Sequence, residues 1–184
     1  AGHHLTFDGA GREQARTAFW SIAPPNGAPP LDEAAFGALL EESVRLHQVS
    51  DVPLAIFLSS GVDSTSVANL ARQASRESVH TFILAFEDRA ASEGPIAEAI
   101  AQAMGTTHHE VVLTEQAFVS RLDAALDSLD QPTFDGLNAW FLSHAIREAG
   151  FSVALVGTGG DELFGGYKSF RDLPTLRRLL RTKI

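Results

Sequence analysis

LAIFLSSGVDST, residues 54–65, is the stretch that decides the fold. Its first five residues are all apolar, which is typical of a strand buried on both faces of a parallel sheet. Residues 59–61 then form a turn of small residues, and residues 63–65 are of types that cap helix N-termini. The stretch therefore predicts a buried strand, a tight turn and a helix that runs to about Ala74.

The rest of the chain repeats this alternation of strand and helix. Apolar runs predict further strands at Val79–Phe86, His109–Leu113 and Val153–Val156. Helical spacing predicts helices at Glu93–Met104, Glu115–Leu129 and Asn138–Ala149, of which the first is expected to end at Gly105. Another predicted helix follows the N-cap candidate Asp32 and ends before Pro53. Strands that alternate with helices predict the α/β class, with a parallel β-sheet and helices on both of its faces.

Composition divides the chain into three parts. Residues 1–22 hold a short alternating stretch and an Asp8-Gly9 turn signal, which indicate a β-hairpin. Residues 23–30 contain four prolines and a glycine, which are typical of a stiff linker at a domain boundary. Residues 31–184 form the main domain, and its basic end from Leu173 predicts the start of an amphipathic helix with a solvated charged face.

Charge and composition exclude several classes of function. Lys and Arg total 14 against 23 Asp and Glu, so the net charge is −9, which disfavours nucleic acid and anionic membranes as partners. No apolar run approaches the roughly 20 residues that cross a bilayer, and the N-terminal residues do not resemble a signal peptide. The chain has no cysteine, so it has no disulfide, thiolate metal site or thiol nucleophile. We expect a soluble domain.

The loop at residues 59–65 has the features of a phosphate-binding site. Its small residues let backbone N–H groups approach an anion, and it opens onto a helix N-terminus with partial positive charge. The loop lacks the lysine of a Walker-type loop, which argues against a kinase or GTPase site. Asp63 fits beside phosphate if a magnesium ion lies between them. The alternative is an ordinary helix cap of small residues.

A second unusual loop follows the last predicted strand and reads GTGGDELFGGY, residues 157–167. Ligands of open parallel sheets bind beyond the carboxyl ends of the strands, where both loops are expected. Asp161 and Glu162 are candidate metal ligands, and the glycines allow the backbone to come close to a nucleotide. A purely structural glycine-rich turn is the alternative, but such a turn does not require two adjacent acids.

The two loops together resemble a known family. Residues 59–64 resemble the S-G-G-x-D-S pyrophosphate loop of N-type ATP pyrophosphatases, and residues 159–167 look like the G-G-D-E-L-F-G-G-Y segment of asparagine synthetases. The second likeness is the more specific, and the resemblance covers nearly the whole chain. It implies an adenine-nucleotide α-hydrolase-like fold for residues 31–184, and it makes residues 1–22 the remnant of an N-terminal glutaminase domain.

The resemblance also implies roles for individual residues. The β- and γ-phosphates of ATP would be held by Ser59, Gly61, Asp63, Ser64 and Thr65. The adenine and ribose would be bound by Leu58, Leu84, Val156 and Gly157. The remaining members of the expected nucleotide site are Ser60, Gly159 and Gly160. Asp63 and Asp161 would bind Mg²⁺, and the catalytic candidates are Asp63, Asp161 and Thr158.

The implied reaction is attack of a carboxylate on the α-phosphorus of ATP, which gives an acyl-adenylate that an amine converts to an amide. Aspartate is the expected acceptor, with glutamine as nitrogen source in the parent enzyme. Three positions depart from the family pattern: Ser60 replaces Gly, Thr158 replaces Glu and Gln131 replaces Glu. They leave open an amidotransferase or cyclase that acts on another carboxylate, and a catalytically silent nucleotide-binding module.

The resemblance also gives expectations about the parent enzyme. Its expected partners are small molecules and its own glutaminase domain, with a homodimer as a candidate assembly in the cytoplasm, where ATP is available. The chain has no glutaminase cysteine, and the family's later lysine falls beyond Ile184, for which Lys168 is a poor substitute. We expect a truncated fragment that binds nucleotide and turns over weakly or not at all.

Two other groups of residues are predicted to be structural. His108 and His109 are neighbours on a predicted strand, so their side chains point to opposite faces and cannot readily share a metal ion. Trp140, Phe141 and Ile146 have helical spacing, which favours a place in the core over a substrate platform.

Overall fold

The structure is a computed structural model that describes residues 2–21, 32–88, 92–131, 133 and 135–181. The chain forms two compact units, Ala1–Phe36 and Gly37–Ile184. The linker predicted at residues 23–30 lies outside the described residues. Among the residues that are described, no helix has the length and apolar character needed to cross a membrane.

The first unit contains the hairpin predicted from residues 1–22. Strands β1 (His3–Phe7) and β2 (Glu13–Ala18) pair antiparallel. Asp8 holds the turn between them, because its Oδ1 accepts hydrogen bonds from the backbone N–H groups of Ala10 (2.9 Å) and Arg12 (3.0 Å). The hairpin is therefore confirmed, whereas its origin in a glutaminase domain stays a prediction.

The second unit is built on a four-stranded parallel sheet with the strand order β5-β4-β3-β6. The strands are β3 (Leu54–Phe57), β4 (His80–Phe86), β5 (Thr107–Leu113) and β6 (Val153–Leu155). The helices are α1 (Glu33–His47), α2 (Val62–Ala74), α3 (Gly94–Met104), α4 (Glu115–Asp127), α5 (Gly136–Glu148), α6 (Gly160–Phe164) and α7 (Lys168–Arg181). Helix α1 crosses the border between the units. Strand β3 pairs with β4 on one side and with β6 on the other, so the loop after it lies at the middle of the sheet edge.

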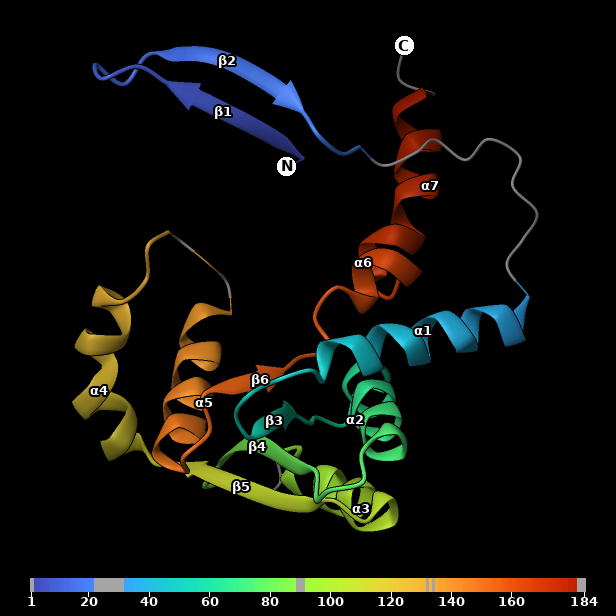
Figure 1. Cartoon of the computed structure of the whole chain (residues 1–184), viewed down its shortest axis with the longest axis vertical. Coiled ribbons are helices and arrows are strands. Elements are labelled where there is room, and N and C mark those ends of the chain that lie inside the picture. The colour runs from blue at the N-terminus through green and yellow to red at the C-terminus, as the bar shows by residue number, and fades with distance from the viewer. Residues whose placement is uncertain (1, 22–31, 89–91, 132, 134, 182–184) are drawn as a thin grey trace. The chain divides into compact units, whose positions relative to one another are not determined.

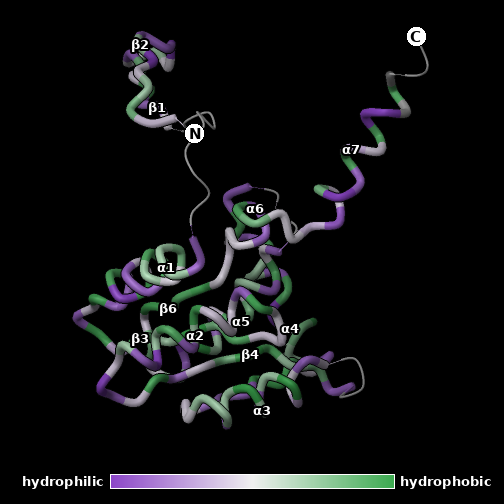
Figure 2. The backbone as a smooth tube through the Cα atoms, turned by 90° about the vertical axis from the view of Figure 1, so that its right-hand side faces the viewer, coloured by the Kyte–Doolittle hydropathy of each residue, from purple (hydrophilic) through white to green (hydrophobic). Residues whose placement is uncertain are grey.

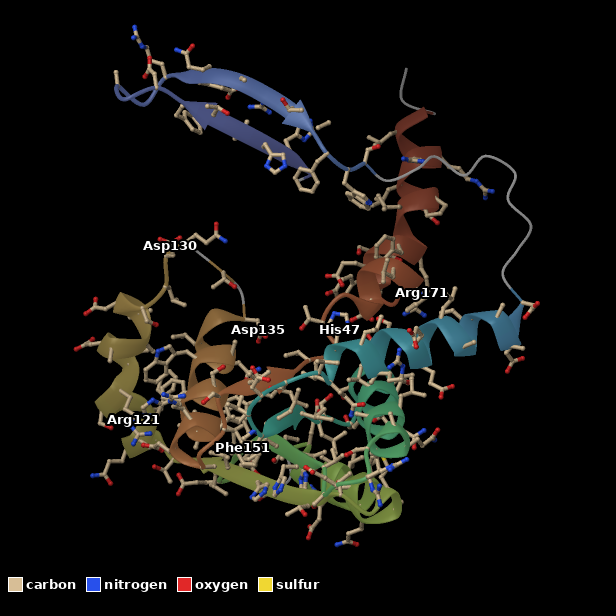
Figure 3. All side chains as sticks on the ribbon, in the orientation of Figure 1. His47, Arg121, Asp130, Asp135, Phe151 and Arg171 are labelled. Atoms are coloured by element: carbon tan, nitrogen blue, oxygen red, sulfur yellow. The ribbon has the colours of Figure 1, made fainter. Side chains whose placement is uncertain are left out.

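Helices cover both faces of the sheet, as the sequence predicts. On one face Ile56 and Leu58 pack with apolar residues of α1, α2 and α3. On the other face Ala55 and Phe82 pack with Leu142 and Ile146 of α5 and with Phe151. Figure 1 shows α4 and α5 on one side of the sheet and α2 and α3 on the other, and Figure 3 shows Phe151 in the layer next to α5. Burial of one large apolar side chain contributes about 1.5–3 kcal/mol to the free energy of folding. Residues of the apolar run at 54–58 belong to the core clusters on both faces of the sheet, so the run stabilises both.

Helix boundaries follow the local chemistry, with two corrections. Asp32 accepts a hydrogen bond from the N–H of Ala35 (2.7 Å) ahead of α1, and Gly105 ends α3 in the left-handed conformation (φ 69°), both as predicted. Capping of α2 by residues 63–65 is wrong, since α2 begins after Gly61 without a side-chain cap. Helix α7 begins at Lys168, before the predicted Leu173, and alternates between hydrophilic and hydrophobic residues along its length (Figure 2).

Candidate functional site

A pocket of about 850 Å³ lies where β3, β4 and β6 end. The sheet brings the two loops singled out in the sequence to this edge, because the carboxyl ends of parallel strands lie together. The predicted site residues that line the pocket are Leu58, Ser59, Gly61, Asp63, Ser64, Leu84, Val156, Gly157, Thr158, Gly160 and Asp161. Those outside the lining are Ser60, Thr65 and Gly159.

The first loop, residues 59–65, is braced by its own hydroxyl groups. Ser64 Oγ accepts a hydrogen bond from the backbone N–H of Ser59 (3.1 Å) and lies 2.8 Å from Ser59 Oγ. Ser59 Oγ in turn accepts a hydrogen bond from the N–H of Gly61 (3.1 Å). Ser64 lies in the first turn of α2, whereas the N-cap position is Gly61, which has no side chain that could cap the helix. The loop is a closed turn that leads into the N-terminus of α2, where backbone N–H groups can meet an anion.

The second loop, residues 157–167, packs directly on the first. A Cβ atom at Gly157 would lie 2.8 Å from the backbone N of Ser64 and 2.9 Å from the carbonyl carbon of Asp63. A Cβ at Gly160 would overlap the Asp63 carboxylate. Gly159 has a φ of 103°, which only glycine adopts readily. The glycines that we predicted to approach a nucleotide thus bring the two loops together.

Every charged side chain among the described residues that line the pocket is acidic: Asp63, Glu93, Asp135 and Asp161. Asp63 and Asp161 come from the two different loops. Glu162, the other candidate metal ligand, does not line the pocket, because its Oε1 accepts a hydrogen bond from the Tyr167 hydroxyl (2.9 Å). That hydrogen bond raises the pKa of Tyr167. Within the described ranges no group of three or more acidic or histidine residues has the arrangement of a metal site.

Two further elements contribute side chains to this pocket beyond the predicted site residues. Glu93 reaches the first loop from the start of α3, where its Oε2 accepts hydrogen bonds from the N–H (3.0 Å) and Oγ (2.9 Å) of Ser60. Asp135 and Asn138 come from the start of α5, and Asn138 donates a hydrogen bond to Asp135 Oδ1 (3.2 Å). Figure 3 shows Asp135 at this end of α5. Glu93 follows a strand, so the rule that directed us to the loops could also have found it.

The neighbouring histidines lie apart from the pocket, as predicted. His109 stacks on Phe82, and its Nε2 lies 3.0 Å from His80 Nδ1. His108 Nδ1 lies 2.9 Å from the Thr81 hydroxyl. Burial lowers the pKa of both His108 and His109, and the nearby His80 lowers that of His109 further. These histidines therefore favour the neutral form and serve the packing of the sheet.

On α5 the predicted core position is confirmed for two of the three residues. Phe141 and Ile146 are buried in the core. Trp140 is half-buried and stacks on His144, with ring centroids 4.9 Å apart.

The parallel sheet, the helices on both of its faces and the small-residue loop after β3 are features of the predicted N-type ATP pyrophosphatase fold class. The Asparagine synthase family model matches residues 35–184. A putative asparagine synthetase of Mycobacterium tuberculosis is 38% identical over 142 residues, which is 76% of this chain and 22% of that protein. Asparagine synthetase 3 of Bacillus subtilis is 29% identical over 91% of this chain and 30% of that protein. The chain belongs to the asparagine synthase family.

Solved structures confirm the fold. The NH₃-dependent NAD synthetase of Campylobacter jejuni superposes with a TM-score of 0.50 at 19% identity, over 74% of this chain and 61% of that one. The glutamine-dependent NAD⁺ synthetase of Acinetobacter baumannii superposes with a TM-score of 0.52 at 20% identity, over 89% of this chain and 31% of that one. At these identities the likeness concerns the fold only. The chain spans less than a quarter of the mycobacterial relative, so the activity of a whole enzyme is a matter for proposal.

Proposed function

We propose that this chain is the ATP-binding and carboxylate-activating part of an amide-forming ligase. The observation that carries the proposal is the meeting of residues 59–65 and 157–167 at one pocket, with Asp63 contributed by the first loop and Asp161 by the second. Membership of the asparagine synthase family supports the same reaction type. A silent nucleotide-binding module has less support, because it would not require acids on both loops.

The proposed reaction has two steps. An oxygen of the acceptor carboxylate attacks the α-phosphorus of ATP, the bond to the bridging oxygen breaks, and pyrophosphate leaves. An amine then attacks the acyl carbon, loses a proton, and displaces AMP to leave an amide. In both steps the protein acts mainly by orienting the reactants and by stabilising charge on the departing groups.

The residues of this chain would divide that work. The N–H groups of Ser59, Ser60 and Gly61 already donate to side chains, so the backbone N–H groups of residues 62–64, in the first turn of α2, would hold the departing pyrophosphate. Leu58, Leu84 and Val156 line the pocket and would contact the adenine and ribose.

The acidic lining would repel a bare triphosphate, so nucleotide binding requires a cation. Asp63 and Asp161 fit Mg²⁺, which binds proteins through one or two carboxylates plus phosphate and water oxygens. The metal would supply neutralisation of the pyrophosphate charge.

Aspartate is the acceptor that we propose first, since it gives the product for which the family is named. Thr158 lines the pocket at the position where the family pattern has Glu. A threonine hydroxyl cannot act as a base near neutral pH, so this observation favours the second candidate, a relative that amidates or cyclises another carboxylate. In either case we propose a cytoplasmic parent enzyme with an N-terminal glutaminase domain that supplies ammonia.

Calorimetric titration of the 184-residue chain with a non-hydrolysable ATP analogue tests the proposal. We expect binding in the presence of Mg²⁺ and at least a tenfold loss, roughly 1.4 kcal/mol, for Asp63→Asn and for Asp161→Asn. Asp123→Asn, an exposed change of the same type on α4, is the matched control and should bind as the parent does. The assignment of the metal ligands would be refuted if the parent chain bound the analogue equally well with and without Mg²⁺. It would also be refuted if Asp63→Asn and Asp161→Asn bound it as tightly as the control Asp123→Asn does.

A further inference from the structure

Ser60 and Glu93 join two loops that lie 33 residues apart in the sequence. One carboxylate oxygen, Glu93 Oε2, accepts a hydrogen bond from the Ser60 N–H at 3.0 Å and another from the Ser60 hydroxyl at 2.9 Å. Hydrogen bonds to a charged acceptor are stronger than those between neutral groups. This pair is here named the Ser60–Glu93 clamp.

Glu93 is held at the start of α3. Its backbone carbonyl accepts hydrogen bonds from the N–H groups of Ile96 (3.1 Å) and Ala97 (3.0 Å). The next residue, Gly94, is buried, and its N–H donates to Ser92 Oγ (3.2 Å). The Glu93 side chain does not cap its own helix. Its carboxylate therefore reaches the first loop from a fixed base.

Ser60 is well placed to transmit this restraint to the pocket. It is outside the pocket lining, whereas its neighbours Ser59 and Gly61 are part of it. A glycine at this position would offer only its N–H to Glu93. The serine adds the hydroxyl as a second donor, so this chain holds its loop at two atoms of one residue.

We propose that Glu93 is a positioning residue that holds the first loop, through Ser60, in the conformation that receives the phosphates. The inference rests on the proposed function, because it assigns a purpose to the clamp only if the loop binds nucleotide. A loop fixed before binding loses less conformational entropy when the ligand arrives. The same carboxylate lines the pocket and repels phosphate. Its positioning effect therefore raises nucleotide affinity, whereas its negative charge lowers it.

Hydrogen exchange in the nucleotide-free chain tests the clamp by itself. We expect Glu93→Ala to speed exchange of the backbone amides of residues 59–62 by about tenfold, because the opening of the loop then breaks two fewer hydrogen bonds. Glu98→Ala, an exposed change of the same type on the same helix, should leave these amides as they are in the parent chain. Equal exchange in the Glu93→Ala variant and the parent would overturn the clamp.

Nucleotide affinity separates positioning from charge. Glu93→Gln removes the charge but keeps an acceptor oxygen, so we expect affinity in Mg²⁺ equal to or above that of the parent. Glu93→Ala removes both and should bind about fivefold more weakly than Glu93→Gln. Equal affinity for the Gln and Ala variants would show that only the charge matters and would overturn the proposal.

A double-mutant cycle completes the test. Ser60→Ala removes the hydroxyl donor, and we expect it to weaken binding in the parent chain but not in Glu93→Ala, because the two groups act on each other. Changes in binding free energy that simply add in the double variant would contradict the clamp. Failure of the parent chain to bind nucleotide would refute the proposed function, and the purpose of the clamp with it, whatever the exchange data show.

Discussion

Replacement of Gly157 by alanine tests whether the packing of the two loops builds the site. The added Cβ would lie 2.8 Å from the backbone N of Ser64, 2.9 Å from the carbonyl carbon of Asp63 and 3.1 Å from the Cα of Ser64. All three atoms belong to the backbone, so no side-chain rotation can relieve the contact. Either the second loop moves outward or the first turn of α2 shifts.

The size of the effect follows from the cost of overpacking. An extra methyl group in a well-packed region costs about 1–3 kcal/mol. For a chain of this length that loss lowers the melting temperature by roughly 2–4 °C per kcal/mol. We therefore expect Gly157→Ala to melt about 2–12 °C lower than the parent. The displacement also separates Asp63 from the second loop, so binding of the ATP analogue in Mg²⁺ should weaken.

Thermal denaturation and calorimetric titration of the same protein preparations measure both effects. Gly37→Ala is the matched control, because Gly37 lies within α1 and no heavy atom lies within 4 Å of its added Cβ. That variant should gain about 0.5–1 kcal/mol from helix propensity and bind nucleotide as the parent does. A Gly157→Ala protein with the stability and affinity of the parent would refute the reasoning on loop packing.

Two further predictions concern titrating groups. Burial lowers the pKa of His108 and His109 below 6.5 in the folded chain. Near that pH the unfolded chain therefore binds more protons than the folded chain. The free energy of unfolding should then fall as the pH drops from about 7.5 to about 5.5. His109→Phe should make this fall shallower in urea titrations, and an unchanged slope would contradict the assignment. Tyr167 is the only tyrosine, so its ultraviolet absorbance reports its pKa, which the hydrogen bond to Glu162 raises above 10.0. Glu162→Gln should lower that midpoint, and a midpoint that does not move would show that the hydrogen bond is absent.

The fold could be predicted from local signals that agree with one another. The run at 54–58 is apolar throughout because β3 lies between β4 and β6 with helices over both faces. Gly105 was recognised because a left-handed residue commonly ends a helix. Capping of α2 by residues 63–65 was predicted wrongly because the helix begins earlier, at Val62, so these residues lie inside its first turn and the N-cap is Gly61.

The site was only partly predictable. The two loops could be found because function in parallel sheets lies after the strands, and each loop is continuous in sequence. The Ser60–Glu93 clamp joins residues 33 positions apart, and no periodicity or spacing encodes that pairing. Asp135 reaches the same pocket from α5, which packs on the opposite face of the sheet from α2 and α3. Residues from separate elements meet only through the three-dimensional fold.

Glycine illustrates why a motif does not by itself assign contacts. From sequence, the glycines at 157–160 indicated close approach to a ligand. In the structure Gly157 and Gly160 approach Asp63 and Ser64 of the other loop. Close approach to a ligand and close approach to another loop both exclude a side chain, so glycine in the sequence is consistent with either. A residue of the motif can therefore be essential because it sets the distance between the two loops, and substitution at Gly157 should impair binding even if Gly157 makes no contact with the nucleotide.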